Sequence, residues 1–564
     1  MLIHWKGNAK ASKSGKQQVE APVFFCVCNR ADFGALISGI AKMSETKALT
    51  YYRPEWTCGR YHAYSRSAIF YNLIEGVSYY FEDSSADVIG AVLRTTRNGS
   101  VLVDDISQDL KIDTNVIIDF FQQLVEVNLL TLSMPTDEGI EIYRKQVHEY
   151  NCKQTNSIEL STVEKLPMAI SNAEMEYSER TGGVTSVMFE LTYNCSEQCI
   201  HCYNPGATRN SEEISKRGDR IELNIHDYKR IIDELYEEGL IKVCLSGGDP
   251  FSKPIVWDIL DYLYSKEIAI DIYTNGQRIV NDVERLSKYY PRTVGISIYS
   301  GIASEHDYIT RIPGSWEKSM QVARRLSELA VPLNLKCCVM RPNVKHYWMV
   351  SDICQQLGAE PQYEINISDS IEGDICARNL RLTPELLEIV LRDDNIKLYV
   401  GPEAPNYGGQ QKDMCNNGCG AAQNTFCITP EGDFIPCCSF HMPFGNFKNK
   451  PLKEILQNPL LETWRNLSLT QYEECGSLPY CDYCNLCPGM NFGEHDTPTK
   501  ASENCCYTAK IRHSLAARMM EGYDPLNGKT FKECLDALPD YVPEKHRQIF
   551  RKDRDNREIQ NMDK

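Results

Sequence analysis

Three cysteines close together in the sequence form the clearest chemical pattern in the chain. Cys195, Cys199 and Cys202 have the spacing C-x3-C-x2-C and come directly after an apolar, strand-like run at 186–191. Three thiolates on one tight loop can hold three corners of a cubane iron–sulfur cluster and leave the fourth iron open to a substrate or cofactor. A structural zinc site fits less well, because it requires a fourth protein ligand and usually uses C-x2-C pairs.

A second group of cysteines lies near the C-terminus, where eleven of the 24 fall between residues 415 and 506. Cys419, Gly432 and Cys437 form the pattern C-x12-G-x4-C, around a hairpin with its turn expected at 430–433. A chain of this size without a secretory signal is not expected to carry a disulfide scaffold, so the clustering indicates metal or redox chemistry. The other cysteines singled out in this region are Cys415, Cys481, Cys484, Cys487 and Cys506.

Strand-like and helix-like segments alternate after residue 184, which predicts βαβ units and a parallel sheet curled into an open barrel. In such folds the ligand lies at the carboxyl ends of the strands, and the cysteine triad follows the first of them. The expected strands are 186–191, 242–245, 268–273, 294–299, 333–340 and 363–367, and the expected helices are 227–238, 255–266, 283–289, 316–329 and 350–357.

The cysteine triad and its place after the first strand resemble the radical SAM family. In that family the three cysteines bind a [4Fe-4S] cluster whose open iron chelates the amino and carboxylate groups of S-adenosyl-L-methionine. One electron then cleaves the sulfonium to methionine and a 5′-deoxyadenosyl radical, which removes a hydrogen atom from the substrate. The resemblance implies an α/β fold with a partial, open βα barrel of radical SAM type.

The same resemblance implies further contacts to S-adenosyl-L-methionine. The segment Gly247-Gly248-Asp249-Pro250 is similar to the family's Gly-Gly-Glu-Pro element, with Asp in place of Glu, and its backbone would receive the amino group. His201 and Tyr203 stand beside the third cysteine, where the family places residues near the adenine. The remaining candidate cofactor contacts, each at or near the end of a strand, are Asn275, Ser297 and Lys336.

The C-terminal cysteines resemble the SPASM extension, which carries up to two auxiliary [4Fe-4S] clusters in maturases of peptides and proteins. The family's C-x2-C-x5-C-x3-C is replaced here by C-x2-C-x2-C. The resemblance implies one cluster on Cys415, Cys419 and Cys437, and a second on Cys481, Cys484, Cys487 and Cys506. A zinc ribbon is the alternative, since C-x2-C knuckles are common zinc ligands.

Residues 50–135 are expected to fold as a winged helix, with short strands at 68–73 and 79–81 and helices at 86–94, 104–110 and from 113 onward. DNA binding is disfavoured, because residues 81–134 carry three basic and nine acidic side chains. The module resembles the leader-recognition element of ribosomal-peptide maturases, which holds a precursor's leader by adding it to a sheet edge.

Composition fits a multidomain globular protein without a nucleic-acid or membrane partner. The net charge is −17, and no apolar run reaches the length of a membrane span. We therefore expect a cytoplasmic location. The expected division is a tail at 1–49, the winged helix at 50–135, a polar, irregular linker at 136–183, the radical SAM partial barrel at 184–380, the Cys-rich SPASM extension at 381–530 and a charged tail at 531–564.

These patterns predict a radical SAM enzyme that modifies a ribosomally made precursor peptide, forming a thioether or carbon–carbon crosslink. Its expected partners are that peptide, bound through its leader, and an electron donor such as flavodoxin or ferredoxin. Two alternatives are a sulfatase-type maturase that makes formylglycine on a folded protein, and a non-enzymatic, zinc-binding winged-helix regulator.

Overall fold

The computed structural model describes residues 50–157, 172–204, 222–371, 375–396, 419–473, 478–484 and 486–542. The candidate ligand Cys415, the N-terminal tail and most of the C-terminal tail lie outside these residues. No helix in the described part of the chain is both long and apolar enough to cross a membrane.

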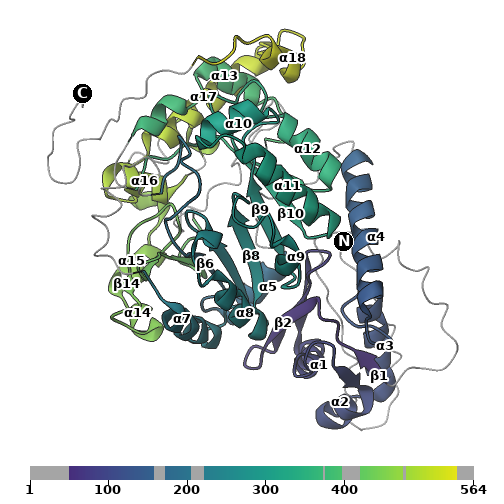
Figure 1. The fold of residues 1–564 in the computed structure, drawn as a ribbon. Helices are drawn as coiled ribbons and strands as arrows, with labels where there is room; N and C mark the ends of the chain where they lie inside the picture. Colours follow the sequence, from purple (N-terminus) through teal and green to yellow (C-terminus); the bar gives the residue numbers. More distant parts are fainter. Residues whose placement is uncertain are drawn as a thin grey trace.

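The largest sheet among the described residues has nine strands (Figure 1). Six of them, β6 to β11, follow one another in sequence and pair in parallel, which confirms the predicted βαβ series and the α/β fold. In spatial order the strands are β11 (Glu360–Glu364), β10 (Leu333–Cys338), β9 (Thr293–Ser297), β8 (Ala269–Thr274), β7 (Lys242–Ser246), β6 (Ser186–Glu190), β12 (Thr425–Ile428), β13 (Asp433–Ile435) and β14 (Gly445–Asn446).

The two faces of the parallel strands differ in character. Along β6, Val187 and Phe189 join the main apolar core, whereas Met188 and Glu190 lie on the opposite face, as the twofold repeat of a strand requires. The apolar face is covered by helices, so the polar face is left to line the interior of the barrel. The covering helices are α7 (Ile225–Glu237), α8 (Val256–Ser265), α9 (Val283–Ser287), α11 (Ser315–Glu328) and α12 (Met349–Leu357). The remaining helix, α10 (Ala303–Thr310), packs beside the cysteine loop, where Ile309 joins a smaller apolar cluster with Ile200.

The hairpin expected between Cys419 and Cys437 forms as β12 and β13, but it does not stand apart from the barrel. β12 pairs in parallel with β6, the strand that leads into the cysteine triad. The rings of Phe426 and Phe434 stack with their centroids 4.3 Å apart inside the main core, so burial of these rings fixes the hairpin to the barrel.

The N-terminal unit contains the short helices and strands that the sequence predicts. An antiparallel sheet of β2 (Thr57–His62), β3 (Ser67–Asn72) and β4 (Val77–Glu82) packs on α1 (Asp83–Leu93) and α3 (Thr114–Glu126). Asp113 caps α3 by accepting a hydrogen bond from the Asn115 amide. The smaller elements are β1 (Thr50–Tyr52), β5 (Ser100–Leu102) and α2 (Val103–Leu110).

The expectation of an irregular linker at 136–183 was wrong. The segment holds two helices, α4 (Asp137–Ser157) and α5 (Asn172–Thr181). The apolar residues of α4 are sparse, but Ile140, Tyr143 and Val147 recur at helical spacing and are buried on one face. The polar composition of the segment therefore did not indicate α4, because this helix buries only one narrow apolar stripe.

The N-terminal unit is attached to the amino ends of the barrel strands, opposite to the ends that carry the cysteine loop. Trp56 and Tyr71 of the unit share an apolar cluster with Ile241, Ala269 and Tyr290, which lie just before or at the start of β7, β8 and β9. Figure 1 shows this unit in purple and blue, with the long α4 beside it and the C-terminal helices along one side of the barrel and at its other end.

The C-terminal region is built mainly from short helices. Two of them bear on the candidate site, α16 (Pro488–His495) and α17 (Glu503–Met520), together with the 3₁₀ turn η5 (Cys481–Tyr483). The others are α13 (Pro384–Val390), α14 (Leu452–Ile455), α15 (Pro459–Arg465) and α18 (Phe531–Asp536).

Candidate cluster and cofactor site

The cysteine triad lies where the carboxyl ends of several strands meet. The Cys199 sulfur is 3.9 Å from the hydroxyl of Tyr299, which follows β9, and 3.5 Å from a carboxylate oxygen of Glu197. The Asn275 amide, which follows β8, donates to the Cys195 sulfur at 3.3 Å. The structure therefore brings the predicted residue Asn275 to the cysteine loop.

The three thiols form a donor set that fits an iron–sulfur cluster. Burial raises the pKa of Cys195 to about 12 and that of Cys202 to about 11, and it also raises the pKa of Cys199 well above its ordinary value. Without a metal the thiols stay protonated, and binding iron releases the protons, because the thiolate is the ligand. Soft thiolate ligands favour iron–sulfur clusters over hard cations such as Mg²⁺.

The His201 ring lies beside the cysteine loop, is partly exposed, and is neutral at physiological pH. Its ring lies edge-on to that of Tyr299, with centroids 4.8 Å apart, and burial lowers the pKa of His201 to about 4. Its buried Nδ1 atom has no hydrogen-bond partner among the described residues. An unpaired polar atom at this position fits a cofactor group that completes the site.

The Gly247-Gly248 turn supports the entry to the cysteine loop. The amides of Gly248 and Asp249 donate to the carbonyl oxygens of Thr192 and Asn194 at 2.7 and 3.0 Å. A Cβ atom on Gly247 would lie 2.4 Å from the Thr192 oxygen, so only glycine permits this approach. The direct contact of this turn with a cofactor amino group stays a prediction, because these two amides are already engaged.

Asp249 is buried next to the same turn. It accepts a hydrogen bond from the Thr274 hydroxyl, while its Oδ2 atom has no partner among the described residues. Burial raises the pKa of Asp249 to about 6, and the Thr274 hydrogen bond opposes this rise. The adjoining Pro250 begins a short 3₁₀ turn and is buried.

Lys336 lies deeper in the barrel than the cysteine loop. Its Nζ atom is 3.2 Å from the centroid of the Tyr273 ring, and burial lowers the pKa of Lys336 to about 8. A Cβ on Gly295 would lie 2.7 Å from the Lys336 side chain, so the glycine makes room for it. Ser297 occupies the last position of β9, on the same face as Gly295.

Glu190 was not singled out from the sequence. Its carboxyl group is fully buried at the end of β6 and accepts hydrogen bonds from the hydroxyls of Tyr193 and Tyr203, at 3.3 and 3.4 Å. Burial raises the pKa of Glu190 to about 8, although both hydroxyls oppose the rise. Its position five residues before Cys195, on the inward face of the first strand, was the available signal.

The C-terminal cysteines lie close enough to affect one another. Burial raises the pKa of Cys437, and nearby Cys438, Cys487 and Cys419 raise it further. A hydrogen bond with Cys484, together with burial, raises the pKa of Cys505, and Cys487 is a neighbour of both Cys505 and Cys419. No three His, Cys, Asp or Glu side chains in the described part of the chain are arranged to bind a single metal ion. The four thiolates of a cubane are held around a cluster rather than around one ion.

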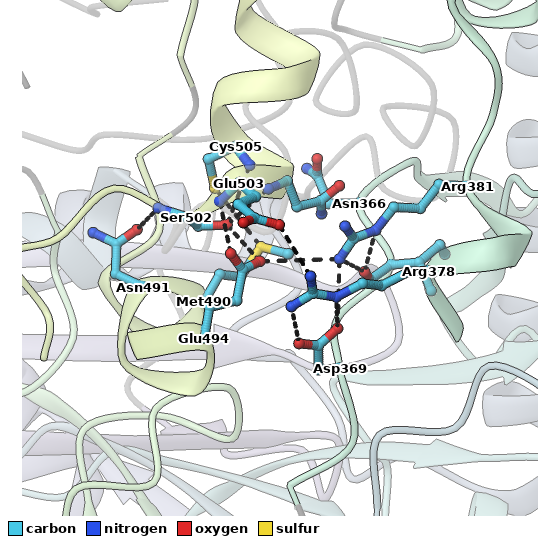
Figure 2. Close-up of polar contacts among 12 residues, drawn as sticks. Asn366, Asp369, Arg378, Arg381, Met490, Asn491, Glu494, Ser502, Glu503 and Cys505 are labelled. Atoms are coloured by element: carbon cyan, nitrogen blue, oxygen red, sulfur yellow. Dashed lines mark hydrogen bonds and ion pairs between the residues drawn. The ribbon is translucent and has the colours of Figure 1, made fainter. Parts of the chain in front are cut away.

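A pocket opens between the cysteine loop, the chain that follows β11 and the start of α16. Its lining includes Tyr203, Asp369, Cys438, His441, Met490 and Glu494. Figure 2 shows how ion pairs hold one wall of the pocket: Arg378 binds Asp369 at 2.6 Å, and Arg381 lies 4.0 Å from Glu494. Asp369 and Glu494 come from separate segments, and their pairing with Arg378 and Arg381 connects these segments in the pocket wall.

Comparison with known proteins agrees with this geometry. The Radical SAM superfamily model matches residues 189–347, and the model of the SPASM iron–sulfur cluster-binding domain matches residues 419–488. These ranges contain the cysteine triad and five of the proposed auxiliary ligands.

Three curated relatives are about a quarter identical to the chain over the aligned residues. The antilisterial bacteriocin subtilosin biosynthesis protein AlbA of Bacillus subtilis is 25% identical over 334 residues, 57% of this chain and 70% of that protein. The AdoMet-dependent heme synthase of Methanosarcina barkeri is 24% identical over 54% of this chain and 90% of its own. The PqqA peptide cyclase of Granulibacter bethesdensis is 25% identical over 44% of this chain and 67% of its own.

Among solved structures, Streptococcus suis SuiB bound to the precursor peptide SuiA matches with a TM-score of 0.46 and 14% identity, over 81% of this chain and 99% of that one. The family matches, the parallel barrel and the cysteine loop at its carboxyl end all agree. The chain contains a radical SAM domain at 189–347 and a SPASM iron–sulfur cluster-binding domain at 419–488, and these domains bind a [4Fe-4S] cluster, S-adenosyl-L-methionine and auxiliary iron–sulfur clusters.

Proposed function

We propose that this enzyme modifies a ribosomally made precursor peptide, forming a thioether or carbon–carbon crosslink within it. The reaction type follows from the cysteine triad, and the similarity to a bacteriocin biosynthesis protein and a peptide cyclase supports a peptide substrate. The observation that carries the peptide assignment is this similarity, and the N-terminal antiparallel sheet of β2, β3 and β4 is the unit proposed to bind the leader as an added strand.

The cofactors would be held by residues already described. Cys195, Cys199 and Cys202 would hold the cluster, with Asn275 orienting the Cys195 sulfur. When bound, the cluster and S-adenosyl-L-methionine supply a 5′-deoxyadenosyl radical that removes a hydrogen atom from the peptide. The protein's own contribution is to position the peptide and to keep water away from the reacting carbon.

Formation of one crosslink removes two hydrogen atoms from the peptide. One leaves as a hydrogen atom, and the second leaves as a proton and an electron. The electron requires an acceptor, and the auxiliary clusters of the SPASM domain are of the right chemical class. The pocket beside Tyr203 and Cys438 lies between the cysteine loop and that domain, so it is the proposed position of the reacting segment.

The alternatives weighed from the sequence are less well supported. A non-enzymatic zinc regulator does not agree with the radical SAM match, which covers the cysteine triad. A formylglycine maturase acting on a folded protein needs no peptide-binding unit, whereas the N-terminal unit of this chain packs against the amino ends of the barrel strands.

A flavodoxin or ferredoxin is the proposed source of the first electron.

Co-expression tests the proposal directly. The enzyme is produced together with a short peptide encoded beside its gene, and the peptide is analysed by mass spectrometry. We expect a loss of the mass of two hydrogen atoms per crosslink and fragmentation that stops at the crosslinked residues. A peptide that remains unmodified beside active enzyme, as judged by 5′-deoxyadenosine formation, would count against the peptide assignment but not against radical chemistry.

A further inference from the structure

We propose that α10 positions Cys199, the middle ligand of the radical SAM cluster, and that Asp307 and Thr310 hold the end of α10 that does so. α10 lies between β9 and α11 in the sequence and packs beside the cysteine loop. Asp307 and Thr310 act through this loop rather than on the cluster, so they are positioning residues. Their role concerns the radical-forming cluster and does not depend on which peptide the enzyme modifies.

Two main-chain hydrogen bonds to the end of α10 bracket Cys199. The Gln198 amide donates to the Thr310 carbonyl at 2.9 Å, and the Ile200 amide donates to the Ile309 carbonyl at 3.0 Å. The last carbonyl groups of a helix have no partner inside the helix, so they are available to a neighbouring loop. Because the amides on both sides of Cys199 bind the same helix end, the position of that end sets the position of Cys199.

A second route from α10 to Cys199 runs through the ring of Tyr299. The His306 Nδ1 atom accepts a hydrogen bond from the Tyr299 amide at 3.2 Å, and the two rings stack with centroids 5.4 Å apart. The Tyr299 hydroxyl lies 3.9 Å from the Cys199 sulfur. His306 is fully buried, so the surrounding core holds this stack in place. α10 thus reaches the sulfur of Cys199 as well as its main chain.

The last turn of α10 is fixed to the start of α11. The Asp307 carboxylate accepts hydrogen bonds from the Gly314 and Trp316 amides, at 2.5 and 2.9 Å. It also accepts a hydrogen bond from the Ser315 hydroxyl at 3.0 Å. The buried hydroxyls of Thr310 and Ser315 are hydrogen-bonded to each other at 2.7 Å. These contacts fix the helix end whose carbonyl groups bind the cysteine loop.

The first turn of α10 is fixed to the segment that follows β9. The Glu305 carboxylate accepts a hydrogen bond from the Ser300 hydroxyl at 2.7 Å and lies 2.6 Å from the His346 Nδ1 atom. The Trp316 indole donates to the Ser300 carbonyl at 3.1 Å. α10 is therefore held at both ends, and groups that hold metal ligands in this way set the geometry in which the ligands meet the metal.

Thr310 is the residue at which this support meets the cysteine loop. Its hydroxyl binds Ser315, and its carbonyl oxygen accepts the Gln198 amide. Thr310→Val removes the hydroxyl and keeps a β-branched side chain of nearly the same shape, whereas Thr310→Ser keeps the hydroxyl. The two variants therefore separate loss of the hydrogen bond from loss of packing. Thr181→Val is the matched control, because the Thr181 hydroxyl donates to the Tyr177 carbonyl within α5, at 2.8 Å.

The test uses full-length, anaerobically reconstituted protein without any peptide. Iron is counted, and electron paramagnetic resonance spectra of the reduced protein are recorded with and without S-adenosyl-L-methionine. We expect Thr310→Val to lose up to about four iron atoms per chain, the content of one cubane. It should also lose the change of spectrum that S-adenosyl-L-methionine causes, while the signals of the auxiliary clusters persist. Thr310→Ser should restore both, and Thr181→Val should behave as the wild type.

Wild-type iron content and an unchanged response to S-adenosyl-L-methionine in Thr310→Val would overturn the positioning role. A loss that Thr310→Ser does not restore would overturn it too.

If Thr310→Val yields no folded protein, Asp307→Asn decides, because it is made at a partly exposed position and leaves one acceptor oxygen. The same selective loss is expected, and equal loss from all clusters, or no loss, would overturn the role. Because no peptide is used, failure here is distinct from failure of the proposed peptide chemistry.

Discussion

The Nζ atom of Lys242, at the first residue of β7, lies 2.8 Å from a carboxylate oxygen of Glu174 on α5. The other oxygen of Glu174 accepts a hydrogen bond from the Tyr71 hydroxyl of the N-terminal sheet, at 3.1 Å. Burial would raise the pKa of Glu174, but the charges of Lys242 and Arg292 and these hydrogen bonds lower it to about 2. Tyr71 of the N-terminal unit thus adds a hydrogen bond to the buried ion pairs at the amino ends of the barrel strands.

Glu174→Gln should destabilise the protein strongly at neutral pH. The substitution leaves Lys242 buried without its anion, whereas Arg292 stays paired with Asp271, and breaking a buried pair in this way costs about 3–5 kcal/mol. Denaturant unfolding of the variant and the wild type measures the difference. Because the folded pKa is depressed, the contribution is present above pH 4.5 and is lost as the pH falls toward 2. Equal unfolding midpoints of the variant and the wild type at pH 7 would contradict a stabilising role for these buried ion pairs.

Glu190→Gln should make stability less dependent on pH. The wild-type carboxyl group keeps its proton in the folded state up to about pH 8, whereas the unfolded chain releases it near 4.5. Wild-type stability should therefore fall relative to the variant as the pH rises from 4.5 to 8, and the difference should be constant above that. Thermal unfolding at pH 6, 7, 8 and 9 measures it, and a difference that does not change with pH would show that Glu190 ionises normally.

Gly248→Ala should remove the radical SAM cluster and spare the auxiliary clusters. The added Cβ would lie 2.4 Å from the Asn194 carbonyl and 2.6 Å from that of Tyr193, just before the cysteine loop. Iron analysis should show a loss of about four atoms per chain, the content of one cubane. Gly139→Ala in α4 is the matched control, since its nearest neighbour is 3.3 Å away. Full iron content in Gly248→Ala would contradict the supporting role of the turn.

The spacing between leader and modified residue should have a lower limit. The N-terminal unit lies at the amino ends of the strands and the cysteine loop at their carboxyl ends, so a peptide bound to the N-terminal unit must pass the height of the barrel sheet. Strands of five or six residues span about 17–20 Å. An extended peptide advances about 3.3–3.6 Å per residue, so about five or six residues are the minimum. Modification of peptides with shorter spacers at an undiminished rate would contradict leader binding by the N-terminal unit.

The sequence predicts the parallel barrel well, because each strand from β6 to β10 is an apolar or β-branched run separated by a helix of regular period. It also locates the cysteine triad, whose ligands are local in sequence. It leaves the ligand partition of the C-terminal cysteines open, because their positions depend on packing between segments that are distant in sequence, such as Gly489 against the Ser439 carbonyl. Glu190 was missed for a related reason: its burial depends on strands that are distant in sequence.

The formation of 5′-deoxyadenosine tests the central claim most directly. Reconstituted enzyme with S-adenosyl-L-methionine and a strong reductant is sampled over time under anaerobic conditions. We predict that the wild type produces 5′-deoxyadenosine and methionine, and that Cys199→Ala produces neither while it retains its auxiliary iron. Absence of the product from the wild type, or an equal yield from Cys199→Ala, would contradict the assignment of this loop as the radical-forming site.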